Sequence, residues 1–131
     1  MAHYLDTSAL VKLVVPEAES TALIDWLRHE SDVAVTSDLS RTELHRAVRK
    51  SAPDRAIQAR QVLDSMTILT VTSQMFEAAG RLEPTTLRSL DAIHLVAALE
   101  LGDDLAGIVT YDERLAEAAR IHGLSVVAPS E

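Results

Sequence analysis

The chain has 131 residues, of which 47% are hydrophobic and 24% are charged, and its formal net charge is −8 at pH 7. This length and composition predict one globular domain with a full core and exclude a disordered or fibrous protein. There is no cysteine, no apolar run near the roughly 20 residues of a membrane span and no apparent signal peptide. We therefore expect a cytoplasmic protein without disulfides or thiolate metal sites.

Short apolar or β-branched runs alternate with helical runs along the chain, and this alternation is typical of a parallel sheet covered on both faces. We expect a three-layer α/β/α sandwich around a central, mainly parallel, five-stranded sheet. The expected strands are residues 2–5, 33–36, 66–71, 107–111 and 125–128. The expected helices are residues 9–15, 17–29, 39–50, 53–64, 73–82, 89–101 and 113–122.

The segment from Ser89 to Leu101 is apolar almost all round, with His94 as the one polar residue between Ala92 and Leu99. A helix without a polar face belongs inside a fold. Asp91 lies at the start of this helix, and a buried carboxylate normally needs a partner, a proton or a metal ion.

Three other acids are expected to lie near Asp91. Asp6 follows the first strand and Asp112 follows the fourth, and sites in such sheets form outside the carboxyl ends of the strands. Glu43 shares the inward face of its helix with apolar neighbours. If the four converge, they form an all-oxygen cluster that suits Mg²⁺ or Mn²⁺ rather than zinc, and such ions assist phosphodiester hydrolysis.

A simpler interpretation exists for each acid. Asp6, Asp91 and Asp112 stand where helices begin, and Asp is a preferred N-cap residue, although Ser8 and Ser89 offer alternative caps. Glu43 could instead pair with Arg46 or Lys50 on its own helix. His94 is one turn from Asp91 and could bond to it, or could be an ordinary core histidine.

Other side chains could support such a site. The hydroxyls of Ser8 and Thr110 lie two residues from Asp6 and Asp112. Half of the twelve Lys and Arg residues fall between Arg41 and Arg60, although the negative net charge alone argues against nucleic-acid binding. Beside a metal site, this basic segment could grip substrate phosphates rather than form a solvated face; the candidates are Arg46, Arg49 and Lys50.

Four segments together resemble the PIN-domain nucleases, and above all the VapC toxins of toxin–antitoxin pairs. These segments are Tyr4-Leu5-Asp6-Thr7-Ser8, Glu43-Leu44, Leu90-Asp91-Ala92-Ile93-His94 and Val109-Thr110-Tyr111-Asp112. The resemblance implies a Mg²⁺- or Mn²⁺-dependent endoribonuclease whose catalytic, metal-binding acids are Asp6, Glu43, Asp91 and Asp112. It also implies a homodimer and an antitoxin encoded alongside, and it leaves the RNA target open.

Other functions fit less well. Haloacid-dehalogenase-like enzymes need a second Asp two residues after the first, where this chain has Ser8. A response-regulator receiver needs an Asp after the third strand, where Val71-Thr72-Ser73 stands. A PIN-like module that binds RNA or protein without catalysis is a non-enzymatic alternative, and the complete set of four acids argues against it.

Overall fold

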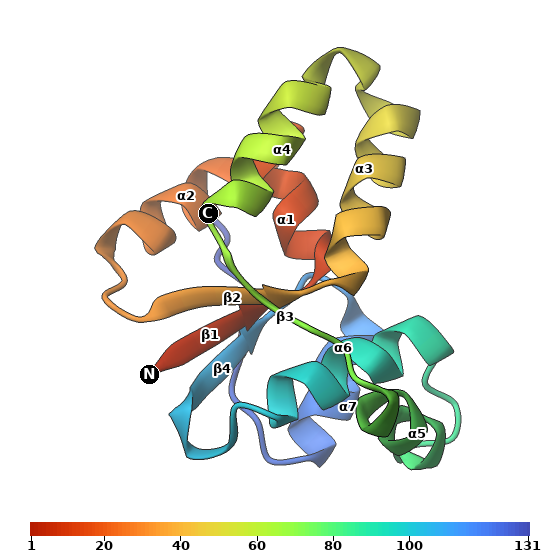
Figure 1. Ribbon diagram of the computed structural model, residues 1–131. Helices are drawn as coiled ribbons and strands as arrows, with labels where there is room; N and C mark the ends of the chain where they lie inside the picture. Colours follow the sequence, from red (N-terminus) through yellow and green to blue (C-terminus); the bar gives the residue numbers. More distant parts are fainter.

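The structure is a computed structural model that describes all 131 residues. A five-stranded sheet lies at the centre, with helices on both of its faces (Figure 1). Every strand pair is parallel, so the predicted α/β/α architecture is confirmed. The strands are β1 (Ala2–Leu5), β2 (Val33–Ser37), β3 (Thr67–Leu69), β4 (Leu105–Val109) and β5 (Val126–Val127).

Seven α-helices accompany the sheet, and none of them has the combination of length and apolar character that crossing a membrane requires. They are α1 (Thr7–Val14), α2 (Ser20–His29), α3 (Leu39–Ser51), α4 (Ala56–Asp64), α5 (Ser73–Arg81), α6 (Ser89–Leu99) and α7 (Glu113–Ile121). Two short 3₁₀ turns complete the chain, η1 (Pro53–Arg55) and η2 (Gly102–Asp104).

The strand order is β3-β2-β1-β4-β5, which places the first strand in the middle. From β1 the chain forms β2 and β3 on one side of the sheet, and it then crosses over to form β4 and β5 on the other side. Such a reversal leaves a crevice outside the carboxyl ends of the central strands. The residues that follow β1, β2 and β4 therefore meet at one edge of the sheet.

Alternate strand residues point to opposite faces, and each face has its own core. Tyr4 and Ile108 pack on the side of α5, α6 and α7, whereas Leu5 and Val109 pack on the side of α1 to α4. Helix α6 is the most buried helix, as its apolar sequence predicts. Its buried residues are Ala92, His94, Leu95, Val96, Ala97 and Ala98.

Some predicted boundaries were wrong. Strand β4 ends at Val109 rather than at Tyr111, because the N–H of Tyr111 donates to the Ser8 hydroxyl instead of to a neighbouring strand. Strand β3, at the sheet edge, has three residues instead of six. Thr72, not Ser73, caps α5 by accepting the N–H of Met75.

Candidate active site

Four acidic side chains occupy the carboxyl edge of the sheet. Asp6 directly follows β1, and Asp112 lies between β4 and α7. Glu43 lies in α3, the helix that follows β2, and Asp91 lies in the first turn of α6. Segments up to 106 residues apart in sequence are therefore brought to one place by the parallel order of the central strands.

Asp6 is the most buried acid, with 3% of its surface exposed. Its Oδ1 accepts hydrogen bonds from the Ser8 hydroxyl at 2.7 Å and from the Ala9 N–H at 3.2 Å. Its Oδ2 accepts from the Thr110 hydroxyl at 2.8 Å. Burial raises the pKa of Asp6, and these hydrogen bonds and the nearby His94 offset part of that rise. The carboxylate is thus held in one orientation.

Ser8, in the first turn of α1, and Thr110, directly after β4, connect these two segments. The Ser8 hydroxyl accepts the N–H of Tyr111 at 2.9 Å, and the Thr110 hydroxyl accepts the N–H of Asp112 at 3.1 Å. Both hydroxyls donate to Asp6, so the structure brings together the two residues that the sequence suggested as supports.

Glu43 is held by two hydrogen bonds to its Oε1. The Thr7 hydroxyl and His94 Nε2 both lie 2.6 Å from this oxygen, which leaves Oε2 without a partner. A carboxylate only accepts, so Nε2 of His94 carries the shared proton. Burial alone would raise the pKa of Glu43, but the bonds from His94 and Thr7 outweigh burial and lower it. The alternative pairing of Glu43 with Arg46 or Lys50 is not formed.

His94 connects Glu43 to the core. The residue is 2% exposed, and its Nδ1 lies 2.8 Å from the hydroxyl of Tyr4, which also lies 2.9 Å from the hydroxyl of Ser37. The alternative bond from His94 to Asp91 is not formed, because the imidazole points across to β1 and α3 rather than along its own helix; His94 is a buried histidine with partners at both ring nitrogens. Only Glu43 and His94 of this connected set carried a sequence signal; Tyr4, Thr7 and Ser37 were missed.

Asp91 is different from the other three acids because no group in the protein donates to it. Arg88 occupies the N-cap position of α6, and no side chain caps this helix, so the capping interpretation is wrong for Asp91 and Ser89. Partial burial raises the pKa of Asp91, and the negative charges of Asp112, Asp6 and Glu43 raise it further, against the opposing effect of His94. The four carboxylates therefore act on one another.

Asp112 both caps a helix and faces the cluster. Its Oδ1 accepts the N–H groups of Arg114 at 2.9 Å and Leu115 at 3.0 Å, at the start of α7. Its Oδ2 has no hydrogen-bond partner. Asp6 likewise caps α1 through Oδ1, so capping and membership of the cluster are compatible for these two residues.

The basic candidates lie on the outer part of α3. Helices α3 and α4 project from the sheet as a hairpin (Figure 1), and Arg46, Arg49 and Lys50 line a hollow on its exposed surface. All three side chains are exposed and lack a carboxylate partner, whereas Arg41 and Arg60 pair with Asp38 and Asp64. Lys50 is seven residues beyond Glu43, about 10 Å along the helix axis.

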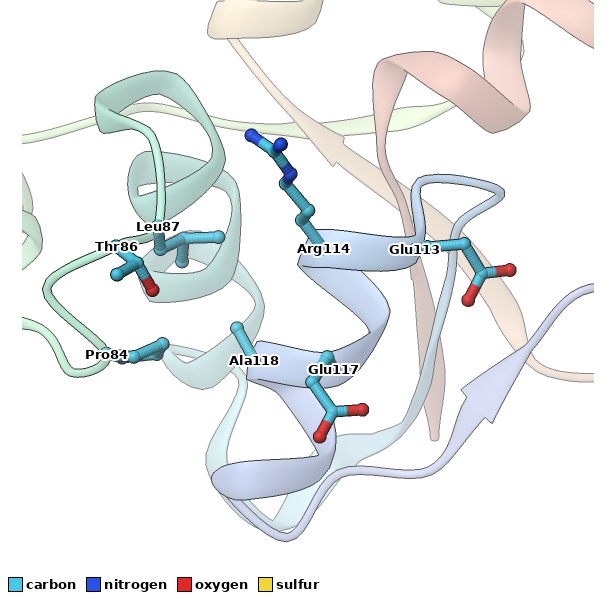
Figure 2. Close-up of a pocket in the computed structure, with 7 residues that line it drawn as sticks. All are labelled: Pro84, Thr86, Leu87, Glu113, Arg114, Glu117 and Ala118. Atoms are coloured by element: carbon cyan, nitrogen blue, oxygen red, sulfur yellow. The ribbon is translucent and has the colours of Figure 1, made fainter.

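A second hollow lies between α7 and the loop before α6 (Figure 2). Pro84, Thr86 and Leu87 form one wall, and the first two turns of α7 form the other. Figure 2 shows Arg114 extending from α7 on the side of Leu87, while Glu113 points the other way. Because the N–H of Arg114 bonds to Asp112, this hollow begins next to the acidic cluster.

Comparison with known proteins identifies the family. The family described as "PIN domain" matches residues 3–121. Ribonuclease VapC47 of Mycobacterium tuberculosis is 44% identical over 130 residues, which cover 96% of each chain. This chain is a member of the PIN-domain family. Ribonuclease VapC46 of the same organism is 43% identical over 129 residues, with 98% of each chain covered.

Solved structures with the same fold agree with this assignment of a PIN domain. The crystal structure of VapC20 from M. tuberculosis, described as a toxin that cleaves the sarcin-ricin loop, matches with a TM-score of 0.80 and 18% identity. The match covers 97% of this chain and 99% of VapC20. VapBC2 from Rickettsia felis, bound to a DNA fragment from its promoter, matches with a TM-score of 0.72 and 18% identity, over 99% and 100% of the two chains.

Proposed function

We propose that this PIN domain is a Mg²⁺- or Mn²⁺-dependent endoribonuclease that acts as a VapC-type toxin and is neutralised by a cognate antitoxin. The observation that carries the proposal is the unpartnered carboxylate of Asp91, at the edge of the sheet where Asp6, Glu43 and Asp112 also lie. The relatives that share more than 40% of their sequence with this chain are named ribonucleases. An RNA substrate implies that the protein acts in the cytoplasm.

The chemistry of the available oxygen atoms suits a hard divalent cation. Both oxygens of Asp91, Oε2 of Glu43 and Oδ2 of Asp112 have no hydrogen-bond partner. The buried Asp6 adds the fourth negative charge. Carboxylates without cysteine are the donor set that Mg²⁺ and Mn²⁺ prefer. We assign these four residues as the catalytic metal ligands. When bound, such an ion supplies Lewis-acid stabilisation of the charge that develops on a phosphodiester during hydrolysis.

The remaining polar residues fix the ligands in place. Ser8 and Thr110 orient the Asp6 carboxylate, and Thr7 and His94 orient Glu43. Such hydrogen bonds hold the carboxylates in position before an ion arrives, so less ordering is needed when it binds. We regard these four as positioning residues.

RNA binding is assigned to the exposed basic residues of α3. Arg46, Arg49 and Lys50 are free of ion pairs and lie one to two helical turns beyond Glu43. Phosphate contacts from such residues position a nucleic acid without reading its sequence. A strand that follows the outer part of α3 would reach the acidic cluster at the base of this helix.

Partner binding follows from the same charges. The acidic cluster complements a basic side chain, and charge complementarity favours association of the correct partners. A structure with this fold is described as a toxin–antitoxin complex from Klebsiella pneumoniae. We therefore propose that an antitoxin covers the cluster with a basic group and that the domain forms a homodimer.

The proposal can be tested with the purified protein, freed of any co-purified partner, and total RNA. Cleavage should require Mg²⁺ or Mn²⁺, stop with a chelator, and disappear in Asp91→Asn. The matched control is Asp103→Asn, which removes the same charge from the exposed turn η2. RNA that is bound but never cut, with any of these ions, would support the silent binding module instead.

A further inference from the structure

A second cluster of metal-binding side chains lies at the opposite edge of the sheet. His3 is in β1, and Glu30 and Asp32 come from the turn between α2 and β2. The parallel register of β1 and β2 pairs Ala2 with Val33, so this turn lies beside the start of β1. The acids of the active site follow the ends of the strands, whereas this cluster precedes them.

The spacing of the donor atoms suits one ion. One nitrogen of His3 and one oxygen each from Glu30 and Asp32 lie within 4.8 Å of one another. His3 Nδ1 is 3.5 Å from Asp32 Oδ2. Two ligands on a tetrahedral ion, each about 2.1 Å from the metal, are about 3.4 Å apart. The observed separation of 3.5 Å leaves room for two ligands of a shared ion.

The nitrogen of His3 provides an independent indication of a missing ligand. His3 is 8% exposed, and its Nδ1 is the one buried side-chain nitrogen or oxygen in the protein that has no hydrogen-bond partner. A buried polar atom without a partner is costly and calls for an explanation. The ring packs edge-on against Trp26, with 4.8 Å between centroids, and the nearest oxygen that the structure gives for Nδ1 is Oδ2 of Asp32, at 3.5 Å without a hydrogen bond.

The two acids are held less tightly and remain accessible. Glu30 Oε1 accepts the N–H of Asp32 at 3.4 Å, which brings the two side chains together. The amino group of Met1 lies 3.8 Å from Oδ1 of Asp32, so Oδ2 is the oxygen that faces His3. Both acids are partly exposed, so an ion can enter from solvent.

We propose that His3, Glu30 and Asp32 form a second metal site that takes a transition-metal ion of the Zn²⁺, Co²⁺ or Ni²⁺ type. An imidazole nitrogen beside two carboxylates favours these ions, whereas Mg²⁺ prefers oxygen ligands alone. The ion would tie the start of β1 to the turn before β2. It would therefore stabilise the fold without taking part in catalysis.

The single tryptophan of the chain provides the test, because its ring contacts His3. Co²⁺ or Ni²⁺ is added with excess Mg²⁺ present, and quenching of Trp26 fluorescence is followed. We expect saturable quenching with one ion per chain, and Zn²⁺ should compete and raise the melting temperature. Asp32→Asn and Glu30→Gln should each weaken binding at least tenfold while RNA cleavage in Mg²⁺ stays unchanged.

Three control variants locate the ion. Asp91→Asn should keep the quenching, which separates this site from the active-site acids. Asp25→Asn and His29→Gln, on the exposed surface of α2, should also keep it. Equal quenching in the parent and Asp32→Asn proteins, loss of quenching only in His29→Gln, or no quenching at all would overturn the proposal.

Discussion

Each carboxylate has two oxygens, and at residue scale this explains why a capping acid can also belong to a metal site. Asp112 uses Oδ1 for two N–H groups of α7 and keeps Oδ2 free. Asp91 has no bond to either oxygen and contributes nothing to capping. The capping and metal-binding interpretations of the acids therefore differ most at Asp91, where a single substitution distinguishes them.

We expect Asp91→Asn to make the metal-free protein slightly more stable at neutral pH. Burial and the neighbouring acids raise the pKa of Asp91, so its ionised form destabilises the native state above that pKa. The residue is partly exposed and screened by solvent, so the gain should stay below about 1 kcal/mol, or about 4 °C in melting temperature.

Lowering the pH and adding a metal ion provide two checks on this prediction. As pH falls through the raised pKa, the parent's Asp91 gains a proton and the two melting temperatures should converge. The variant should also lose most of the rise in melting temperature that Mg²⁺ or Mn²⁺ produces in the parent. Thermal scans with and without the ions measure both. An undiminished metal response in Asp91→Asn would contradict the assignment of this residue as a ligand.

His94→Gln should weaken metal binding without removing a ligand. The imidazole holds Glu43 through Nε2 and is itself held by Tyr4, and loss of such a supporting bond typically lowers metal affinity about 10- to 100-fold. The metal-induced change in melting temperature, titrated with Mg²⁺, measures this. His45→Gln on α3 is the matched control. Equal affinities in the two variants would assign His94 to packing alone.

At the scale of elements, the sequence predicted what depends on local pattern. Hydrophobic periodicity and the breaks at Pro and Gly placed the helices within a few residues, and the apolar run 92–99 identified α6 as buried. The end of β4 was missed because it depends on Ser8, which is 103 residues from Tyr111 in sequence. Local pattern contains no information about such a long-range bond.

The same limit applied to the site. The four acids could be proposed from the sequence because Asp6 and Asp112 follow strands, Asp91 lies at the start of a buried helix and Glu43 lies on an inward helix face. Their partners could not, because Tyr4, Thr7 and Ser37 are ordinary strand and cap residues until folding brings His94 beside them. The cluster at His3 was also missed, since it requires the register of β1 against β2.

Helix α3 is the element whose surface should set the salt dependence of RNA binding. Replacing Arg46, Arg49 and Lys50 by Ala should weaken binding to all single-stranded sequences alike. The slope of log affinity against log salt should become shallower by roughly 0.7 for each phosphate that the variant no longer neutralises. Binding is best measured in the Asp91→Asn background, where RNA stays intact. A double variant of Arg28 and Arg120, on α2 and α7, is the control, and an unchanged slope would make α3 a solvated face.

The whole molecule carries a net charge of −8, yet its charges are separated in space. Half of the Lys and Arg residues fall between Arg41 and Arg60, in the helical hairpin α3–α4 that projects from the sheet (Figure 1), while four of the twenty acids lie at the carboxyl edge of the sheet. The proposed RNA and divalent ion would therefore bind to adjacent regions of opposite charge. A partner that supplies a basic group to the acidic cluster would occupy the position of the ion.

This arrangement predicts that the antitoxin and the metal ion compete. The antitoxin is expected to be the product of the adjacent reading frame, and it would be recovered by co-purification with this chain. Because a basic side chain and a divalent cation neutralise the same carboxylates, excess Mg²⁺ at constant ionic strength should weaken the complex, and Asp91→Asn should reduce this effect. Titration calorimetry measures both, and sedimentation tests whether the free toxin is a dimer. An affinity that Mg²⁺ leaves unchanged would show that the antitoxin inhibits from outside the acidic cluster.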